Sequence, residues 1–249
     1  MGEALVHVEE LTLAWDERVI QRDLNFDVRP GEVLVLMGGS GCGKSTLLRH
    51  LIGLQVPARG RIRYGGIDLA SADETQRDQL RERFGVMFQA GALWSSMSVG
   101  ENVMLPMQEL TTLAPAEIET LARFKLALVG LEGAFDASPA DLSGGMKKRA
   151  AIARAMALDP PLLYLDEPSA GLDPITSARL DELILHLRDH LGTTIVMVTH
   201  ELDSIFAVAD RALFLDAQEK TMTALDAPRA LLLHGPEPVR HFLQGRARP

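Results

Sequence analysis

One segment constrains this chain more than any other: residues 38–45 read Gly-Gly-Ser-Gly-Cys-Gly-Lys-Ser, which fits the pattern G-x-x-x-x-G-K-[ST]. It follows an apolar run typical of a buried strand, Val33–Met37, and precedes a helical pattern at Thr46–Ile52. Glycines between a strand and a helix let the backbone curl until several N–H groups point at phosphates. The segment therefore predicts a site for a nucleoside triphosphate, against the alternative of a Gly-rich turn that binds nothing.

The side chains of this loop have separate expected tasks. Lys44 is expected to reach the β- and γ-phosphates, and the Ser45 hydroxyl to ligate Mg²⁺. We expect Cys42, close to a helix N-terminus, to favour the thiolate and to be shielded by nucleotide; the alternative is a buried, inert thiol. The residues expected to contact the nucleotide are Gly38, Gly39, Ser40, Gly41, Cys42, Gly43, Lys44, Ser45 and Thr46.

Hydrophobic periodicity predicts an α/β fold. Short alternating runs at 5–8, 24–28 and 61–64 predict antiparallel strands in a small β region beside the nucleotide. Apolar runs at 162–165 and 194–199, separated by a helical pattern from Leu180 to Leu191 that Gly192 should end, predict a parallel core sheet. Between them, residues 90–155 predict a helical lobe, with one helix opened by Pro115 and another over Lys147–Leu158.

Whole-chain properties exclude some classes of function. The 249 residues include 25 basic and 34 acidic side chains, a net charge of −9 that repels nucleic acid and anionic membrane surfaces. The single cysteine cannot form an internal disulfide, which suits a reducing compartment. We find neither a signal-peptide pattern nor an apolar run of roughly 20 residues, so any membrane crossing is expected in another subunit.

A second constellation indicates the kind of nucleotide-binding protein. Leu142-Ser143-Gly144-Gly145-Met146 is followed by a basic, Ala-rich helix and then by an apolar strand that ends in Asp166-Glu167. This order resembles the ATP-binding cassette (ABC) family, in which the first segment is the signature motif and the second is the Walker B motif. Further matches are Gln89 after the strand 84–88 as a Q-loop, residues 169–173 as a D-loop, and His200 as the switch histidine.

The resemblance covers almost the whole chain and implies a P-loop NTPase fold with a RecA-like core, an antiparallel β subdomain and an inserted α-helical subdomain. We expect residues 1–89 and 156–225 to form the core with its β subdomain, 90–155 the helical subdomain, and 226–249 a C-terminal helical tail. The last fourteen residues, with three prolines and three arginines, are expected to be partly frayed.

The same motifs assign chemistry. Phosphoryl transfer to water needs positioning and stabilisation of spreading negative charge. Asp166 is expected to hold Mg²⁺ through water, and Glu167 to polarise the attacking water as the general base. The resemblance implies that His200 bonds the γ-phosphate and that Gln89 touches Mg²⁺ or water and senses the transport partner; taken alone, His200 would be read as a cap or core residue. The predicted catalytic set is Lys44, Gln89, Glu167 and His200, and the predicted metal set is Ser45, Gln89 and Asp166.

Two further contacts to nucleotide are predicted. Trp15 lies 23 residues before Gly38, where the family places an aromatic ring that stacks on adenine; plain packing is the alternative. Asp16 and Glu17 beside it are expected to form an exposed turn. Ser143, Gly144 and Gly145 open a helix whose N–H groups suit a γ-phosphate, and the resemblance assigns them to the nucleotide of a second copy. The alternative is an ordinary N-cap followed by two glycines.

Further residues resemble one particular group of ATPases within the ABC family. Met146 stands where the signature usually has Gln, and the ATPases of MCE (mammalian cell entry) lipid transporters, the Mla type, share it together with the residues around the Q-loop. Those residues are Phe88–Trp94, Met97, Val99, Asn102, Val103 and Pro106, and the segments 173–176 and 239–245 also match. The implied cargo is phospholipid, and the implied partners are a second copy, a membrane permease, a periplasmic MCE protein and a STAS-domain regulator. The implied location is peripheral, on the cytoplasmic side of the inner membrane.

Other classes stay open. The nucleotide site alone does not distinguish a cassette that serves an amino acid, sugar or drug transporter. A soluble ABC protein acting on DNA or ribosomes fits neither the length nor the acidity, and a non-catalytic module fits poorly with Lys44, Asp166, Glu167 and His200 all present. We expect Trp94 and Met97 to contact the permease, against the alternative that they pack the helical lobe.

Overall fold

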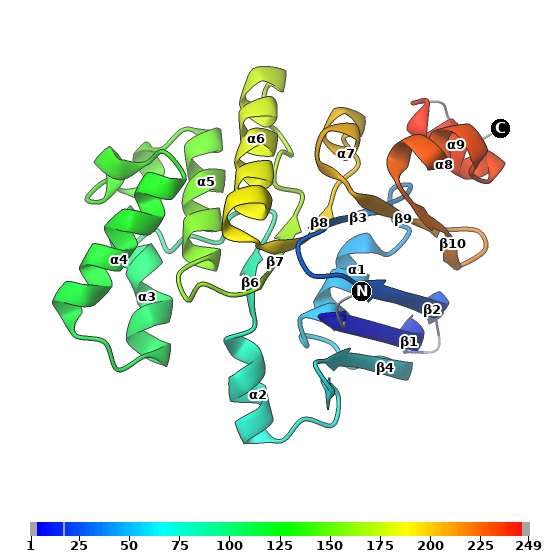
Figure 1. The fold of residues 1–249 in the computed structure, drawn as a ribbon, viewed down its shortest axis with the longest axis horizontal. Coiled ribbons are helices and arrows are strands. Elements are labelled where there is room, and N and C mark those ends of the chain that lie inside the picture. Colours follow the sequence, from blue (N-terminus) through cyan, green and yellow to red (C-terminus); the bar gives the residue numbers. More distant parts are fainter. Residues whose placement is uncertain (1–3, 17, 246–249) are drawn as a thin grey trace.

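Two β-sheets organise the part of the chain that the computed structural model describes, residues 4–16 and 18–245 (Figure 1). The larger sheet has the spatial order β10 (Thr221–Asp226), β9 (Arg211–Asp216), β3 (Val33–Met37), β8 (Thr194–Val198), β7 (Leu162–Asp166), β6 (Phe84–Met87). Its neighbours are parallel from β9 to β6, and β10 is antiparallel to β9. The smaller, antiparallel sheet has the order β2 (Arg18–Val28), β1 (Val6–Trp15), β4 (Arg59–Tyr64), β5 (Ile67–Asp68). The predicted parallel core sheet and antiparallel β region are both confirmed.

The strand β3 is buried on both faces, which explains its uninterrupted apolar sequence. Its alternate side chains enter two different hydrophobic layers. Val33, Val35 and Met37 join a cluster with the helices on one face. Leu34 and Leu36 join a second cluster with the smaller sheet and the first helix. The strand that carries the phosphate loop is therefore held from both sides.

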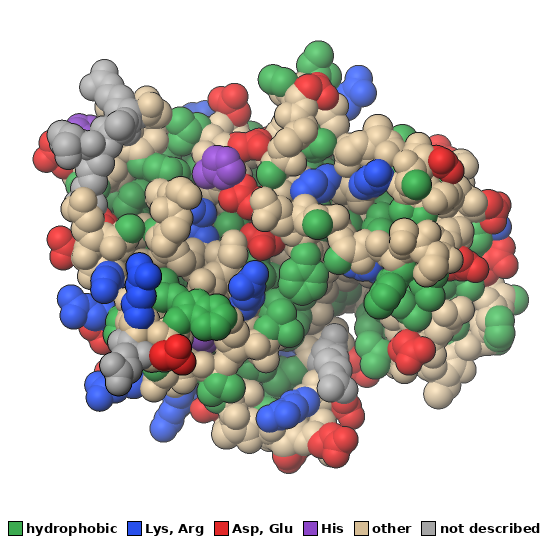
Figure 2. All heavy atoms as spheres, turned by 180° about the vertical axis from the view of Figure 1, so that it is seen from behind, with side chains coloured by type: hydrophobic (Ala, Val, Ile, Leu, Met, Phe, Trp, Pro, Cys, Tyr) green, Lys and Arg blue, Asp and Glu red, His purple; other side chains and the backbone are tan. Residues whose placement is uncertain are grey.

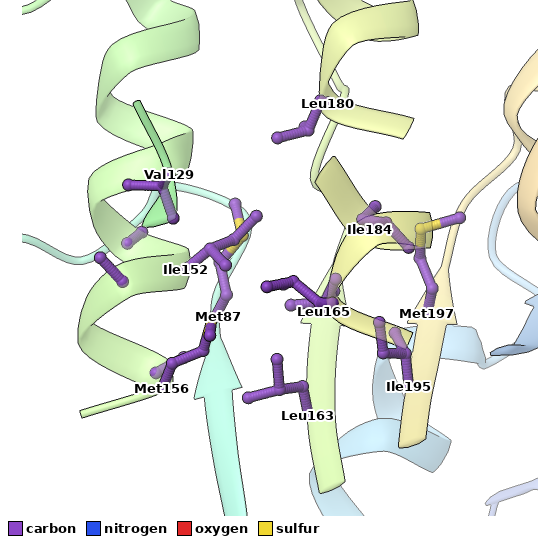
Figure 3. Close-up of a cluster of buried hydrophobic side chains, with 14 of the residues drawn as sticks. Met87, Val129, Ile152, Met156, Leu163, Leu165, Leu180, Ile184, Ile195 and Met197 are labelled. Carbon is purple, nitrogen blue, oxygen red and sulfur yellow. The ribbon is translucent and has the colours of Figure 1, made fainter. Parts of the chain in front are cut away.

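The helices surround the larger sheet on both faces. Figure 1 shows α3, α4 and α5 grouped at one end of the molecule and α8 and α9 at the other, beyond β10. Figure 3 shows side chains of α5 and α6, among them Ile152 and Ile184, lying over the strand residues Leu165 and Met197. The helix bounds are α1 (Lys44–Leu51), α2 (Glu74–Arg81), α3 (Val99–Leu110), α4 (Pro115–Leu128), α5 (Gly144–Ala155), α6 (Pro174–Leu191), α7 (Leu202–Val208), α8 (Pro228–His234) and α9 (Glu237–Leu243), with 3-10 turns at Glu132–Ala134 and Pro139–Asp141.

Local capping chemistry explains where helices begin and end. The predicted helix at 180–191 is α6, which ends at Gly192 with φ +68° as expected. It begins earlier, because one Asp173 carboxylate oxygen accepts the N–H groups of Ile175 and Thr176 at 3.1 Å. The helix predicted over 147–158 is shifted to Gly144–Ala155, since the Ser143 hydroxyl accepts the Met146 N–H at 3.3 Å.

Two parts of the chain differ from the expectations. The helix α2 is absent from the prediction because Leu80 is its one apolar residue; an Asp73–Gln76 capping box starts it instead. The expectation of fraying from residue 236 onward is wrong for the described part of that segment, since α9 buries Val239 and Leu243 in the core. Glu17 and residues 246–249 lie outside the described residues. The subdomain boundaries stay predictions.

No helix in the described ranges has both the length and the apolar character that a bilayer span requires.

A buried carboxyl joins α6 to α7. The Ser204 hydroxyl donates to Asp181 Oδ2 at 2.9 Å, and both residues are buried. The pKa of Asp181 is raised to about 6, chiefly by burial; the bond from Ser204 acts in the opposite direction, and the charges of Glu201 and Asp203 act in the same direction as burial. In the unfolded chain the pKa returns toward its ordinary value near 4. The folded protein thus binds more protons between about pH 4 and 6, and its stability falls as pH rises through that window.

We expect Asp181→Asn to stabilise the protein at pH 7.5 by on the order of 1 kcal/mol, or about 2–4 °C in Tm, because the amide still accepts from Ser204 but carries no buried charge. At pH 4.5, where the native carboxyl is protonated, the difference should vanish. Thermal unfolding at the two pH values measures both. Asp189→Asn is the control, because this exposed carboxylate pairs with Arg188 at 2.6 Å and its loss should not raise Tm. An Asp181→Asn gain that is equal at both pH values would contradict the assignment.

Candidate nucleotide site

The phosphate loop leaves the carboxyl end of β3 and enters α1 through left-handed glycines. Gly38 and Gly43 have φ values of +147° and +101°, which L side chains rarely adopt. A Cβ at Gly38 would lie 2.4 Å from the Leu215 carbonyl oxygen, and one at Gly43 would lie 2.8 Å from the Ile20 side chain. A Cβ at Gly41, in contrast, would meet nothing within 4 Å. The loop is closed against the protein on one side and open on the other.

The open side faces a cavity of about 860 Å³. This cavity brings together the predicted loop residues with Trp15, Glu167 and His200, which come from three distant parts of the chain. Its lining residues are Trp15, Arg18, Ile20, Gly38, Gly39, Ser40, Gly41, Cys42, Gly43, Lys44, Ser45, Thr46, Glu167, His200, Ala217, Lys220 and Phe242. The volume suits a nucleotide-sized ligand.

Lys44 lies under the loop. Its ammonium donates to the Gly38 and Gly39 carbonyls at 2.9 and 3.1 Å, and the side chain is buried. A buried ammonium needs such acceptors, because an unpaired charge away from water is costly. Both acceptors belong to the loop, so the positive charge stays beside the cavity, where phosphate oxygens could reach it.

Ser45 and Asp166 form a pair that fits a hydrated Mg²⁺. The Ser45 hydroxyl donates to Asp166 Oδ1 at 3.3 Å. Burial raises the pKa of the Asp166 carboxyl, and the neighbouring Glu167 charge raises it further. A divalent cation would offset both effects. The described residues contain no group of three or more His, Cys, Asp or Glu side chains that could hold a metal. The hydroxyl and carboxylate oxygens of Ser45 and Asp166 suit Mg²⁺, which is commonly held by one or two protein oxygens together with phosphates and waters.

Glu167 and His200 lie side by side at the cavity. His200 Nδ1 is 2.9 Å from a Glu167 carboxylate oxygen, and the Glu167 N–H donates to the Val198 carbonyl at 2.9 Å. Glu167 is buried and has φ +50°, an uncommon backbone conformation for a side-chain-bearing residue. The ends of β7 and β8 thus hold the predicted base and the predicted switch histidine in contact.

A family model described as "ABC transporter" matches residues 21–170. The chain belongs to the ABC transporter family. It is an ATP-binding, ATP-hydrolysing cassette of α/β P-loop fold, as the motifs and the fold predicted.

Several relatives resemble the cassette over nearly its full length. The probable ribonucleotide transport ATP-binding protein mkl of Mycobacterium leprae is 41% identical over 247 residues, which are 99% of this chain and 70% of that protein. The intermembrane phospholipid transport system ATP-binding protein MlaF of Haemophilus influenzae is 38% identical, over 99% of this chain and 93% of that protein. Among solved structures, the dimeric post-hydrolysis state of the ATP-binding cassette MJ0796 bound to ADP and Pi has a TM-score of 0.80 at 28% identity, covering 89% of this chain and 98% of that one.

Five predicted site residues do not line this cavity. One of them, Asp166, is joined to it by the hydrogen bond that it accepts from the lining residue Ser45. Gln89 is exposed and lies outside it, although its carbonyl accepts a hydrogen bond from Lys148. Ser143, Gly144 and Gly145 lie at the N-terminus of α5; Ser143 and Gly145 line a separate hollow together with Met146. The cassette therefore does not bring its signature segment to its own phosphate loop.

Some lining residues are missing from the prediction. Arg18 and Lys220 add positive charge to the cavity, and Phe242 adds an aromatic wall from α9. Figure 2 shows Lys and Arg side chains gathered on the side of the molecule that carries the β1–β2 turn. Arg18 begins β2, Lys220 lies in the turn before β10, and Phe242 lies on a short helix. None of them belongs to a recognisable motif, so no sequence signal marks them. Trp15 also lines the cavity, with 56% of its surface exposed, while its stacking on adenine stays a prediction.

The thiolate expectation for Cys42 is wrong. The side chain is 2% exposed, and burial raises the pKa of its thiol although Lys44 acts in the opposite direction. Although Cys42 lies close to the N-terminus of α1, the helix does not favour a thiolate there, because the side chain lies in the hydrophobic cluster formed by α1 and the smaller sheet. The buried alternative holds, and any contact of Cys42 with nucleotide falls to its backbone.

We expect a maleimide to label Cys42 of the folded cassette on the order of 10² times more slowly than it labels glutathione, because reaction requires local opening. Mg-ATP should change this rate less than mild denaturant does. Timed labelling followed by intact-mass measurement gives the rate, and the unfolded chain in guanidinium is the positive control. Rapid labelling of the native protein that Mg-ATP blocks would restore the exposed-thiolate interpretation.

Proposed function

We propose that this cassette drives phospholipid movement between membranes as the ATPase subunit of an MCE-type (Mla-type) transporter. In this proposal it lies on the cytoplasmic side of the inner membrane, acts as a dimer, and joins a membrane permease, a periplasmic MCE protein and a STAS-domain regulator. The observation that carries the proposal is the segment from Phe88 to Pro106 together with Met146, which resembles that group of ATPases. The proposal is supported by the relatives named MlaF, which are ATP-binding proteins of intermembrane phospholipid transport systems and are matched over 90–93% of their length.

The geometry supports defined tasks for the site residues. When bound, Mg-ATP supplies the phosphoryl group and a cation that neutralises developing charge. Lys44, which lines the cavity, would hold the phosphates, while Ser45 and Asp166, which bond to each other, would hold the metal. Glu167 would polarise the water and take its proton, with His200 orienting the carboxylate from 2.9 Å. Gln89 would join this set only after its loop moves, because its side chain is exposed outside the cavity.

The position of the signature segment supports a composite site. Ser143 and Gly144 are exposed at the start of α5, and neither lines the cavity that Lys44 lines. Their N–H groups and the positive end of the helix dipole would suit a γ-phosphate supplied by another chain. The dimeric structure of MJ0796 with ADP and Pi is consistent with such an arrangement. Each site would then need two copies of this chain.

Hydrogen bonds from a buried asparagine hold the backbone of the loop before α3. Asn102 is fully buried, and its side-chain amide accepts the Trp94 N–H at 2.7 Å and donates to the Trp94 and Ser98 carbonyls at 3.1 and 2.9 Å. The Trp94 ring is nevertheless 59% exposed. A fixed backbone that presents an exposed aromatic ring is typical of a protein interface. We therefore assign Trp94, with the neighbouring Met97, to the permease contact.

A ribonucleotide cargo is the second candidate, because the relatives named mkl are 40–41% identical to this chain. Nothing at the nucleotide site separates the two cargoes. Only the response of an assembled transporter distinguishes them.

The composite site leads to one prediction. Mixing a Ser143→Arg subunit with a Lys44→Ala subunit should restore ATPase activity to about a quarter of wild type, because each mixed dimer keeps one intact site and half of the dimers are mixed. Phosphate release measures this. Each variant alone, and a chain that carries both substitutions, should stay inactive. Mixed dimers that form but hydrolyse no ATP would contradict the arrangement in trans.

The cargo assignment leads to another prediction. In a reconstituted complex with its permease, phospholipid should stimulate ATP hydrolysis several-fold and ribonucleotides should not. Trp94→Asp should weaken permease assembly at least about tenfold, since it places a charge in an apolar contact, while the free subunit still binds ATP. Phe124→Asp, a matched change at another exposed aromatic on α4, is the control. A complex that responds to a ribonucleotide, sugar or amino acid and ignores phospholipid would reject the proposed cargo.

A further inference from the structure

We propose that Lys148 is a positioning residue that ties the signature helix α5 to both the Glu167 backbone and the Q-loop, so that moving α5 moves the general base. The inference rests on the role proposed above for Glu167. Lys148 contributes nothing to the cavity lining. It would act on catalysis entirely through the two main-chain segments that it holds.

The contacts of Lys148 are few and well placed. Its side chain is 9% exposed, and its ammonium donates to the Gln89 carbonyl at 2.5 Å and to the Glu167 carbonyl at 3.1 Å. Gln89 follows β6 and Glu167 follows β7, two neighbouring parallel strands. A single ammonium therefore bridges the ends of two strands of the larger sheet. Hydrogen bonds from a charged donor are stronger than neutral ones, so each bond restrains its carbonyl firmly.

The Glu167 backbone needs such restraint. Its left-handed φ of +50° costs free energy for a residue with a side chain, and such conformations persist where surrounding contacts hold them. The Val198 carbonyl accepts the Glu167 N–H, and the Lys148 ammonium donates to the Glu167 carbonyl. Without Lys148 the peptide after Glu167 would lose its charged donor. The carboxylate, which lies 2.9 Å from His200, would then sample other positions.

The position of Lys148 on α5 connects this restraint to the signature. Lys148 is one turn before Ile152, on the same helix face, and Figure 3 shows Ile152 beside Met87 of β6. It is also five residues after Ser143, the N-cap of α5. The helix that would meet a second copy's nucleotide at its N-terminus thus carries, just over one turn later, the ammonium that holds the base of its own chain.

The negatively charged groups around Lys148 suit an ammonium at this position. Burial lowers the pKa of Lys148, and the negative charges of Glu167, Asp166 and Glu201 act in the opposite direction. The charge is thus partly offset by the acidic cluster that the nucleotide site requires. Lys148 also brings positive charge close to buried carboxylates that would otherwise repel each other.

The test compares Lys148→Met with wild type in the full-length protein, assembled with its permease where turnover requires it. Methionine keeps the length and packing but donates no hydrogen bond. We expect kcat to fall on the order of 10–10²-fold, with the KM for ATP, ATP binding and Tm nearly unchanged. In a Glu167→Gln background, single-turnover phosphate release should show no further loss from Lys148→Met, because both substitutions disable the same group.

Three controls sharpen the result. Lys147→Met removes the same charge from the same helix at a half-buried position and should leave kcat within about threefold. Lys148→Arg keeps a charged donor and should recover most of the turnover. Lys148→Leu, which is smaller and has no hydrogen-bond donor, replaces Lys148→Met as the test if Lys148→Met lowers Tm.

The outcomes separate the two proposals. Wild-type kcat in Lys148→Met or Lys148→Leu, while Glu167→Gln is inactive, would overturn the role of Lys148 and leave Glu167 as the base. Losses that multiply in the double variant would also overturn it, because Lys148 would then act independently of Glu167. Near-normal turnover in Glu167→Gln would instead remove the base itself, and the inference about Lys148 would fail with it.

Discussion

Burial of β3 between two hydrophobic layers is the constraint on which the site depends. Val33, Val35 and Met37 are held by the helices of one face, while Leu34 and Leu36 are held by α1 and the smaller sheet. Because both hydrophobic layers are closely packed against β3, the strand cannot move without disrupting contacts on both of its faces. The phosphate loop begins where this strand ends, so its left-handed glycines are anchored to a strand that is buried on both faces. The neighbouring strands β7 and β8 bring Asp166, Glu167 and His200 to the same edge.

The electrostatics of the site follow from this rigidity. Asp166, Glu167, Lys44 and Lys148 are all buried, which is costly unless each charge has partners. The lysines find backbone carbonyls, whereas burial raises the pKa of the Asp166 carboxyl. A cation held beside Asp166 would relieve that cost. Part of the binding energy of a metal nucleotide would therefore come from the unfavourable state of the empty site, a common property of functional centres.

The sequence predicts the centre of this molecule better than its edges. The motifs at 38–45, 142–146 and 166–167 lie between β3 and α1, at the start of α5 and at the end of β7, next to the strands and helices that the sequence predicts there. The apolar strands are equally clear, since burial on both faces leaves a continuous hydrophobic run. The polar helix α2 has no such periodicity, and its start depends on a side-chain cap.

Tertiary contacts account for what the sequence does not predict in the site. The direction of the Cys42 side chain depends on the packing of α1 against the smaller sheet, which local spacing does not reveal. In the sequence, Lys148 is one of several positive charges on a basic helix. Only the fold shows that its ammonium donates to the carbonyls of residues that follow two different strands. Arg18 and Lys220 reach the cavity from separate strand ends, and no short motif joins them.

The aromatic wall contributed by Phe242 has a consequence for how the protein is made. Phe242 packs edge-on against Phe214 at 5.5 Å and lines the same cavity as residues 38–46. A ribosome adds about 5–20 residues each second, so roughly 10–40 s separate synthesis of the phosphate loop from synthesis of this wall. During that time a nascent chain can form the loop but not the finished cavity. Nucleotide would therefore meet its complete site only near the end of translation, and its binding can stabilise the cassette only as a late step of folding.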